Sequence, residues 1–520
     1  MSRLEKSAKN IALTMGSNIL DSVLGIVSRT VFIHSLGSQY LGLAGLLQNI
    51  LGFLSISELG IASAIGFSLY KPLATGDTKT VSALMSLYRR AYRIIAVVVF
   101  ICGIGLFSLL DFFVPPEQQP PETGLAYFTF LVNTVLGYLL SYKITLLNSD
   151  NHGYKLAPVT IGMSIAQTTV QVVGLLLFKS YTLYLAVLLV CSAVRMTIGN
   201  WLISKWYPQI NFRSKETLNE STQREIKRNI GGLVIAKIGD YLVNSTDNLI
   251  ITKLISLAAT GIYSNYLLIR NVVNGYNAVL FGGISASMGN IVAVESNEKK
   301  LEAFNTLFFC AYFIYSFEAV CFMCLFNPFI GEIWLGEEYT FDAVTVAIMV
   351  INYYLTGLRI PLITMKGTAG KYLEDAWVPF GFAAVNLVAS VILAKHMGVP
   401  GVFLGTIIGS MCTADWYRPI VIYKHVFHTS VAKYYRRYGG YLGLGLCLIA
   451  VTYSLASLVQ TPFVLVTFVL RSVIAAGVPI AFNCLIFWRD REFQAIRTMF
   501  SRMFGGIMER IGSIVRKENG

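Results

Sequence analysis

The stretch RNIGGLVIAKIGDYLVNSTDNLIITK, residues 228–253, is long enough to cross a bilayer as a helix at about 1.5 Å per residue. It nevertheless carries four polar side chains, which are Lys237, Asp240, Asn244 and Asp247. On a helix their spacing places them within an arc of about 80°. Because a charge at the membrane centre costs about 2.5–3.5 kcal/mol on insertion scales, this stripe cannot face lipid. It indicates either a buried Lys237–Asp240 pair that holds helices together or the wall of a polar cavity in a transporter.

The same stretch resembles a second copy of the start of the chain. Aligning Arg228–Ile230 with Lys9–Ile11, an offset of 228 − 9 = 219 residues, places Asp240 on Asp21 and Gly261 on Gly42. Internal repeats of this size are typical of transporters, which bind their ligands where the repeats meet.

Composition predicts an all-α polytopic membrane protein. Hydrophobic residues make up 55% of the chain and charged residues 13%, whereas soluble domains have about 25% charged residues. The mean hydropathy is +0.61. Hydrophobic runs predict about fourteen spans, at 11–34, 41–69, 88–113, 124–147, 156–178, 181–204, 229–253, 259–292, 303–326, 342–365, 377–396, 399–423, 438–459 and 463–488.

These spans predict two lobes of six helices and two further helices. The first lobe is expected at 1–205, a cytoplasmic linker at 206–228, the second lobe at 229–424 and the last two helices at 425–488. Residues 489–520 alternate apolar and basic positions at helical spacing, which favours an amphipathic helix on the inner leaflet over a solvated tail.

The distribution of lysine and arginine predicts that both termini are cytoplasmic. The expected outer loops at 114–123 and 327–341 contain neither residue, whereas the expected inner loops are rich in both. The net charge of +13 is therefore mainly a topology signal, and nucleic-acid binding is the weaker explanation. Because the outer loops are short, they leave no room for a folded catalytic domain.

Polar side chains recur on several spans, and together they predict a water-filled cavity lined by both halves of the chain. Single polar residues often only join helices, at under about 1 kcal/mol each, but several stripes here carry full charges. The cations expected to bind an anionic group such as phosphate are Arg29, Lys237, Arg270 and Arg359. The polar residues expected to bind sugar hydroxyls are Asn18, Gln48, Gln167, Gln171, Asn244, Asn274, Asn277 and Asn352.

No motif for catalysis is present in the sequence. It has no phosphate-binding Walker loop, no nucleophile elbow and no zinc motif. We therefore expect a protein that is not an enzyme and that needs no cofactor or metal.

The run LGFLSISELGIASAIGFSLYKPLATGDTKTVSALMSLYRRAYRIIA, residues 51–96, resembles bacterial Wzx-type polysaccharide flippases of the MOP transporter superfamily. Ser57–Ile61, Ser68–Ala74, Ser245–Asn248 and Trp334–Gly336 carry the resemblance. It implies two six-helix lobes around a cationic cavity in the bacterial plasma membrane. It further implies alternating access that moves an undecaprenyl-pyrophosphate-linked oligosaccharide to the outer leaflet, with Arg29 and Arg270 facing the cavity and polysaccharide assembly proteins as partners.

Four acidic residues at depth in the spans are hypothetical coupling or gating groups: Asp21, Glu58, Asp240 and Asp247. Three alternatives stay open. A MATE-type cation-coupled drug antiporter would favour an acidic cavity, a MurJ-type lipid II flippase would share the cationic one, and a non-transporting scaffold would have a dry, ion-paired core.

Overall fold

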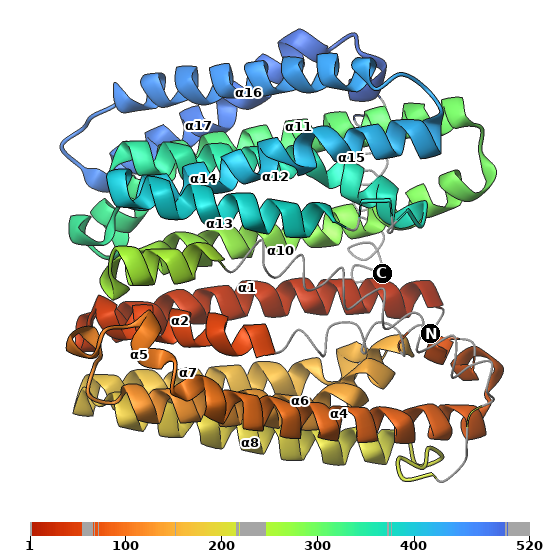
Figure 1. Cartoon of the computed structure of the whole chain (residues 1–520), viewed down its shortest axis with the longest axis vertical. Coiled ribbons are helices and arrows are strands. Elements are labelled where there is room, and N and C mark those ends of the chain that lie inside the picture. The colour runs from red at the N-terminus through yellow and green to blue at the C-terminus, as the bar shows by residue number, and fades with distance from the viewer. Residues whose placement is uncertain are drawn as a thin grey trace, which may run out of the picture. The chain divides into compact units, whose positions relative to one another are not determined.

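A computed structural model describes residues 3–54, 66, 68–70, 72–150, 152–214, 218, 246–371, 374, 375, 377–494 and 497. Within these ranges every regular element is helical, and ten helices are long and apolar enough to cross a membrane (Figure 1). The predicted all-α polytopic membrane fold is therefore confirmed. Contacts between helices divide the chain into one unit of Met1–Ala278 with Pro379–Gly405 and another of Val279–Val378 with Thr406–Gly520.

The first unit is a bundle in which α4 packs on α6, α6 on α8, α8 on α7 and α7 on α1. Its helices are α1 (Arg3–Leu36), α2 (Ser38–Leu54), α4 (Thr78–Phe107), α5 (Leu110–Phe113), α6 (Thr123–Ser149), α7 (Ala157–Phe178), α8 (Tyr181–Trp206), the helical residues 246–254, most of α10 (Leu257–Val294), most of α13 (Val378–Met397) and the start of α14 (Val399–Cys412), with short 3-10 turns at Pro116–Gln118 and Gly153–Lys155.

Helix α4 begins ten residues before the predicted span at 88–113 and ends six residues before its end. Asp77 caps its first turn, because its carboxylate accepts hydrogen bonds from the backbone N–H of Thr80 (3.0 Å) and from the Thr80 hydroxyl (2.6 Å). These hydrogen bonds hold the pKa of Asp77 below its usual range. The first turn of α4 is polar and exposed at Thr78 and Lys79, and residues 81–86 after it are all buried, Ser82 and Ser86 included. An average hydropathy misses a helix that begins with such polar residues.

Helices α2 and α10 cross so closely that their backbones touch at Gly42 and Gly261. A Cβ on Gly42 would overlap the carbonyl oxygen of Leu257, and a Cβ on Gly261 would overlap that of Ser38. The same offset of 219 residues relates Ser38 to Leu257 and Gly42 to Gly261. Such reciprocal contacts are those that a two-fold axis through the crossing would produce, and they support the internal repeat.

The second unit is organised around α11 (Asn297–Asn327), which packs on α12, α16 and α17. Of the window around α11, 72% is buried, the largest share of any candidate span among the described residues. The other elements are the last part of α10, a π-helix at Pro328–Trp334, a 3-10 turn at Glu337–Tyr339, α12 (Ala343–Thr368), the end of α14, α15 (Ala414–Ile422), a π-helix at Tyr423–Phe427, α16 (Ala432–Ser457) and α17 (Val464–Phe487).

Aromatic rings fill the core of this second unit. Tyr312 and Tyr441 stack with ring centroids 4.5 Å apart, and two buried hydroxyls of this core have a hydrogen-bond partner. The hydroxyl of Tyr312 donates to Asn483 Oδ1 (2.8 Å), and that of Tyr354 donates to the carbonyl oxygen of Tyr441 (2.6 Å). These bonds remove the penalty for burying the hydroxyls and fix α11, α12, α16 and α17 together.

The predicted division into lobes at 1–205 and 229–424 stays a prediction. Of the predicted linker, residues 207–214 have no helix, and 219–228 lie outside the described residues. The predicted amphipathic tail also lies outside them beyond Arg497.

Replacing Gly42 by valine should destabilise the protein, because the new side chain would force two backbones apart. Overpacking costs about 1–3 kcal/mol even where only side chains must move. Gly45→Val is the matched control, since a Cβ on Gly45 has nothing within 4 Å. We expect the thermal unfolding midpoint in detergent to fall clearly for Gly42→Val and little for Gly45→Val, and equal midpoints would contradict the close crossing.

Candidate functional site

A cavity of about 870 Å³ lies within the first unit, between α1, α2 and α10. Phe130 and Tyr184 complete its wall from α6 and α8. Among the polar lining residues are Asn18, Asp21, Arg29, Gln48, Asn248 and Asn271. The volume is near the upper end of the range of about 300–1,000 Å³ for ligand pockets. The cavity is therefore large enough for a polar group of several rings.

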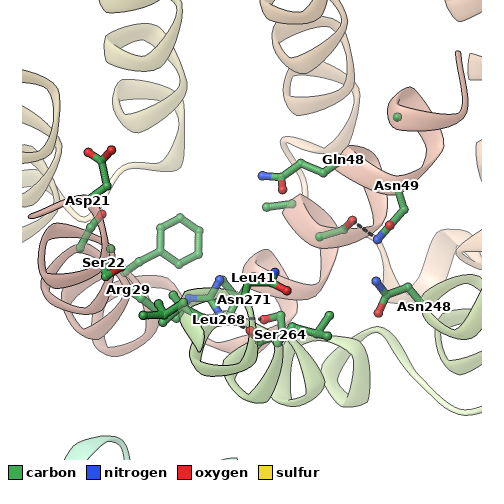
Figure 2. A pocket seen from close by; sticks show the side chains of 18 of the residues that line it. Asp21, Ser22, Arg29, Leu41, Gln48, Asn49, Asn248, Ser264, Leu268 and Asn271 are labelled. Carbon is green, nitrogen blue, oxygen red and sulfur yellow. Dashed lines mark hydrogen bonds between the residues drawn. The ribbon is translucent and has the colours of Figure 1, made fainter. Parts of the chain in front are cut away.

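Arg29 joins α1 to α10 across one wall of this cavity. Its Nη1 donates to the carbonyl oxygen of Ser264 (2.6 Å), to the Ser264 hydroxyl (3.1 Å) and to Asn265 Oδ1 (3.2 Å), and Figure 2 shows Arg29 beside Ser264 and Asn271. All three acceptors are uncharged. Among the described residues nothing accepts a hydrogen bond from its Nε or Nη2, so the guanidinium keeps donors for a ligand.

Asp21 is the carboxylate of the described cavity lining. It stands on α1 eight residues before Arg29, or about 12 Å along the helix axis, and it is exposed. Figure 2 shows it on the other side of Arg29 from Asn248. The described lining thus holds one cation and one carboxylate.

The structure places Arg270 on another face of α10 from the cavity. Tyr263, Arg270 and Asn277 form a stripe at seven-residue spacing on one face of α10, and none of them lines the cavity. Tyr263 instead packs on Phe403, with ring centroids 5.0 Å apart, inside the same unit. The implied role of Arg270 as a cavity residue is therefore not reproduced in this cavity. The physical reason is the rotation of 100° per residue around a helix. It turns Ser264 and Asn271, each one residue after Tyr263 and Arg270, toward the cavity.

The stripe of α10 that does line the cavity was missed from the sequence. It consists of Thr260, Ser264, Asn271 and Gly275, spaced four, seven and four residues apart. This helical period was visible in the sequence, but small and uncharged residues made it less conspicuous than the stripe of Arg270.

Asn248 also lines the cavity, although the sequence analysis named it only within the run Ser245–Asn248 and not as a binding residue. It is 8% exposed, and its buried Oδ1 has no hydrogen-bond partner among the described residues. A buried amide oxygen without a partner costs free energy, so this atom can accept a hydrogen bond from a ligand in the cavity.

Two predicted sugar-binding residues, Asn18 and Gln48, do line the cavity. Gln167 and Gln171 do not, because they join α7 to α8. Gln167 Oε1 accepts a hydrogen bond from Arg195 Nη2 (3.3 Å), and Gln171 Nε2 donates to the carbonyl oxygen of Tyr184 (3.2 Å). Such bonds between helices are the expected use of polar side chains in membranes. Gln171 thereby supports Tyr184, whose own side chain reaches the cavity wall.

Three more of the predicted residues that the structure describes do not line this cavity. Asn274 lies on α10 outside the lining, and Asp247 is buried and has a partner. Asn352 lies on α12 in the second unit. Glu58, Lys237, Asp240 and Asn244 lie outside the described residues.

Arg359 forms a buried charge pair in the second unit. Its Nε lies 3.3 Å from Asp415 Oδ1, and the two side chains are 9% and 8% exposed. The Nε–H itself donates to the carbonyl oxygen of Leu355 (3.2 Å), so Arg359 and Asp415 interact as charges without a direct hydrogen bond. Ser410 donates to the other carboxylate oxygen (3.0 Å). Arg359 therefore holds α12 to α15. This contact indicates a structural role for Arg359, whereas the sequence analysis expected a cavity cation.

Comparison with known proteins agrees with this architecture. The chain is similar in fold to a solved structure of the lipid II flippase MurJ in an inward closed conformation. The match covers 92% of this chain and 99% of that chain, with a TM-score of 0.62 and 13% sequence identity. An inward-facing multidrug resistance MATE family transporter matches 77% of the chain and 94% of its own, with a TM-score of 0.56 and 13% identity. The fold is that of the MOP-superfamily transporters.

At the level of sequence, no protein-family model matches the chain. It is 22% identical over 449 residues to the uncharacterized membrane protein EpsK of Bacillus subtilis (strain 168), which covers 80% of this chain and 84% of that protein. The predicted multi-pass membrane protein with a MOP fold is thus established.

Breaking the Arg359–Asp415 pair from one side should destabilise the protein strongly. Asp415→Ala leaves the buried guanidinium without its counter-charge, a change that typically costs about 3–5 kcal/mol. The double variant Arg359→Met with Asp415→Leu should recover most of the loss, because both charges are then gone.

The measurement is the thermal unfolding midpoint of the purified protein in detergent. Glu295→Ala serves as the control, because its pair with Lys299 is exposed (2.8 Å) and should contribute under about 1 kcal/mol. A double variant no more stable than Asp415→Ala would contradict the charge pair as the cause.

Proposed function

We propose that the protein is a flippase that moves an undecaprenyl-pyrophosphate-linked oligosaccharide from the inner to the outer leaflet of a bacterial plasma membrane. The observation that carries this proposal is Arg29, a cation in a polar cavity of about 870 Å³ whose guanidinium has donors that no described residue uses. The MOP fold supports alternating access as the mechanism.

Arg29 is the residue suited to the pyrophosphate. Its guanidinium is held on α10 through one nitrogen, so its remaining N–H groups keep a fixed direction toward the cavity. Forked N–H donors match two oxygens of a phosphate, and bonds to a charged acceptor are about twice as strong as neutral ones. Since the described partners of Arg29 are neutral, a phosphate would bring this side chain a counter-charge.

The other lining residues suit a sugar. Asn18, Gln48 and Asn271 offer amide donors and acceptors, and the orphan oxygen of Asn248 can accept from a hydroxyl. Tyr184 adds an aromatic ring with a polar edge. The combination of one phosphate-binding cation with several neutral amides favours a glycan over a small anion, which needs no such extended lining.

Translocation needs such a cavity because lipid cannot solvate the headgroup. Each charge and each unpaired hydroxyl would cost several kcal/mol in hydrocarbon. The cavity supplies replacement hydrogen bonds while the lipid tail stays in the membrane. The proposed process moves the molecule without making or breaking a covalent bond, so the protein acts without enzymatic catalysis.

Asp21 is the coupling candidate that this cavity retains. It is an exposed carboxylate within the lining, so a coupling cation that enters the cavity could bind it. The described lining does not show the acidic excess that a cation-exporting antiporter would favour. Lipid II is the second candidate substrate, and the similarity to MurJ over 99% of that chain supports testing it.

The decisive experiment measures translocation in proteoliposomes with an impermeant enzyme that modifies exposed glycan. We expect labelled undecaprenyl-pyrophosphate oligosaccharide to become accessible with wild-type protein and at least about tenfold more slowly with Arg29→Gln, because one charged hydrogen bond contributes about 1.5–3 kcal/mol. Glutamine can still donate to Ser264, so its effect reports the charge more than the link between helices.

Lys205→Gln is the control, because this exposed lysine on α8 lies outside the cavity lining. The same assay with lipid II and with a cationic dye separates the candidate substrates. Transport of the dye alone would contradict the proposed function, and so would an unchanged translocation rate of the labelled lipid with Arg29→Gln.

A further inference from the structure

A cluster of four cations lies at one end of the first bundle, apart from the cavity. The basic cluster consists of Arg89 and Arg93 on α4, Lys143 on α6 and Arg213 in the segment after α8. Arg89 lies close enough to Arg93, Arg213 and Lys143 for its positive charge to repel theirs. All three arginines also act on Tyr142, which places them around one side chain.

The basic cluster is held in place by hydrogen bonds. The buried hydroxyl of Ser86 donates to the carbonyl oxygen of Ser214 (2.7 Å), and the backbone N–H of Asn211 donates to the hydroxyl of Ser82 (3.0 Å). These bonds fasten the segment of Arg213 to α4. Its charge therefore stays near those of Arg89 and Arg93 without the cost of ordering a loose loop.

Lys143 is fixed just as firmly on the other side. Its Nζ donates to the carbonyl oxygen of Asn200 (3.0 Å) and to the Ser204 hydroxyl (2.7 Å) on α8. It also lies 4.8 Å from the centre of the Phe212 ring. The side chain is 6% exposed, which is rare for a lysine without a carboxylate partner.

No carboxylate among the described residues pairs with any member of the basic cluster. Four like charges held near one another raise the free energy of the folded protein. A bound anion would remove this repulsion, and it could accept bonds from two arginine forks.

The surroundings place the basic cluster at the level of lipid headgroups. Beyond Arg93, α4 presents the exposed apolar side chains of Ile94, Val97 and Ile101, as a lipid-facing helix does. On α8, the turn that binds Lys143 also carries the exposed Trp201, with Lys205 Nζ 5.2 Å from its ring centre. Tryptophan and lysine of this kind mark the boundary between hydrocarbon and water.

We propose that the basic cluster binds the phosphate of an anionic phospholipid. The acyl chains would lie along the apolar face of α4, and the phosphate would meet Arg89, Arg93 and Arg213. Basic pockets between helices at this depth suit such headgroups. The site lies outside the cavity lining and does not depend on the transported substrate.

The test is native mass spectrometry of the full-length protein purified in detergent and titrated with phosphatidylglycerol or phosphatidylcholine. We expect selective retention of phosphatidylglycerol, with a dissociation constant at least about tenfold weaker in Arg89→Gln/Arg93→Gln. Arg213→Gln should weaken it in the same direction. Each of these side chains is at least partly exposed, so the variants should fold.

Arg90→Gln is the matched control, because this exposed arginine lies next to Arg89 on α4 but is turned about 100° away from it around the helix. Its affinity should stay within about twofold of wild type. Equal retention of phosphatidylcholine, or no loss in either arginine variant, would overturn the proposal. So would displacement by inorganic phosphate or pyrophosphate at the same concentration, which would indicate a site for a free anion.

Discussion

The cost of an uncompensated charge in hydrocarbon governs this structure, because every deeply placed ion must find a partner. In the second unit the partners are opposite charges: Arg359 pairs with Asp415, while Lys366 and Arg418 share the fully buried Asp375 at 2.9 and 3.2 Å. In the first unit Arg29 and Lys143 bind neutral oxygens instead. The buried cations of the second unit are thus compensated by carboxylates, and those of the first unit by neutral oxygens. Only a cation with neutral partners keeps its charge available to a ligand.

This distinction separates cations that pair with a carboxylate from cations that bind neutral oxygens, which residue type and depth alone could not do. Hydropathy predicted several helices to within two residues, for example 156–178 and 181–204 against Ala157–Phe178 and Tyr181–Trp206. Those ends are decided locally, where Ser180 caps α8 and Lys179 ends α7 in a left-handed conformation. Local chemistry of this kind is visible in a sequence.

The candidate site was only partly predictable for the opposite reason. Arg29, Asp21, Asn18 and Gln48 were found because α1 and α2 each have one polar face toward the cavity. Helix α10 has two polar stripes, and the sequence of the helix alone does not indicate which stripe faces the cavity. The partner of Arg359 lies 415 − 359 = 56 residues away. Contacts that depend on tertiary packing cannot be read from the period of one helix.

The crossing of α2 and α10 also has an evolutionary consequence. At Gly42 and at Gly261, the atom that excludes a side chain is a backbone oxygen of the other helix. A clash between two side chains can be relieved by shrinking either one, but every residue type has the same carbonyl group. No second substitution on the facing helix can therefore rescue the first. If the two halves descend from a duplicated ancestor, each copy has had to keep its own glycine for the sake of the other copy's main chain.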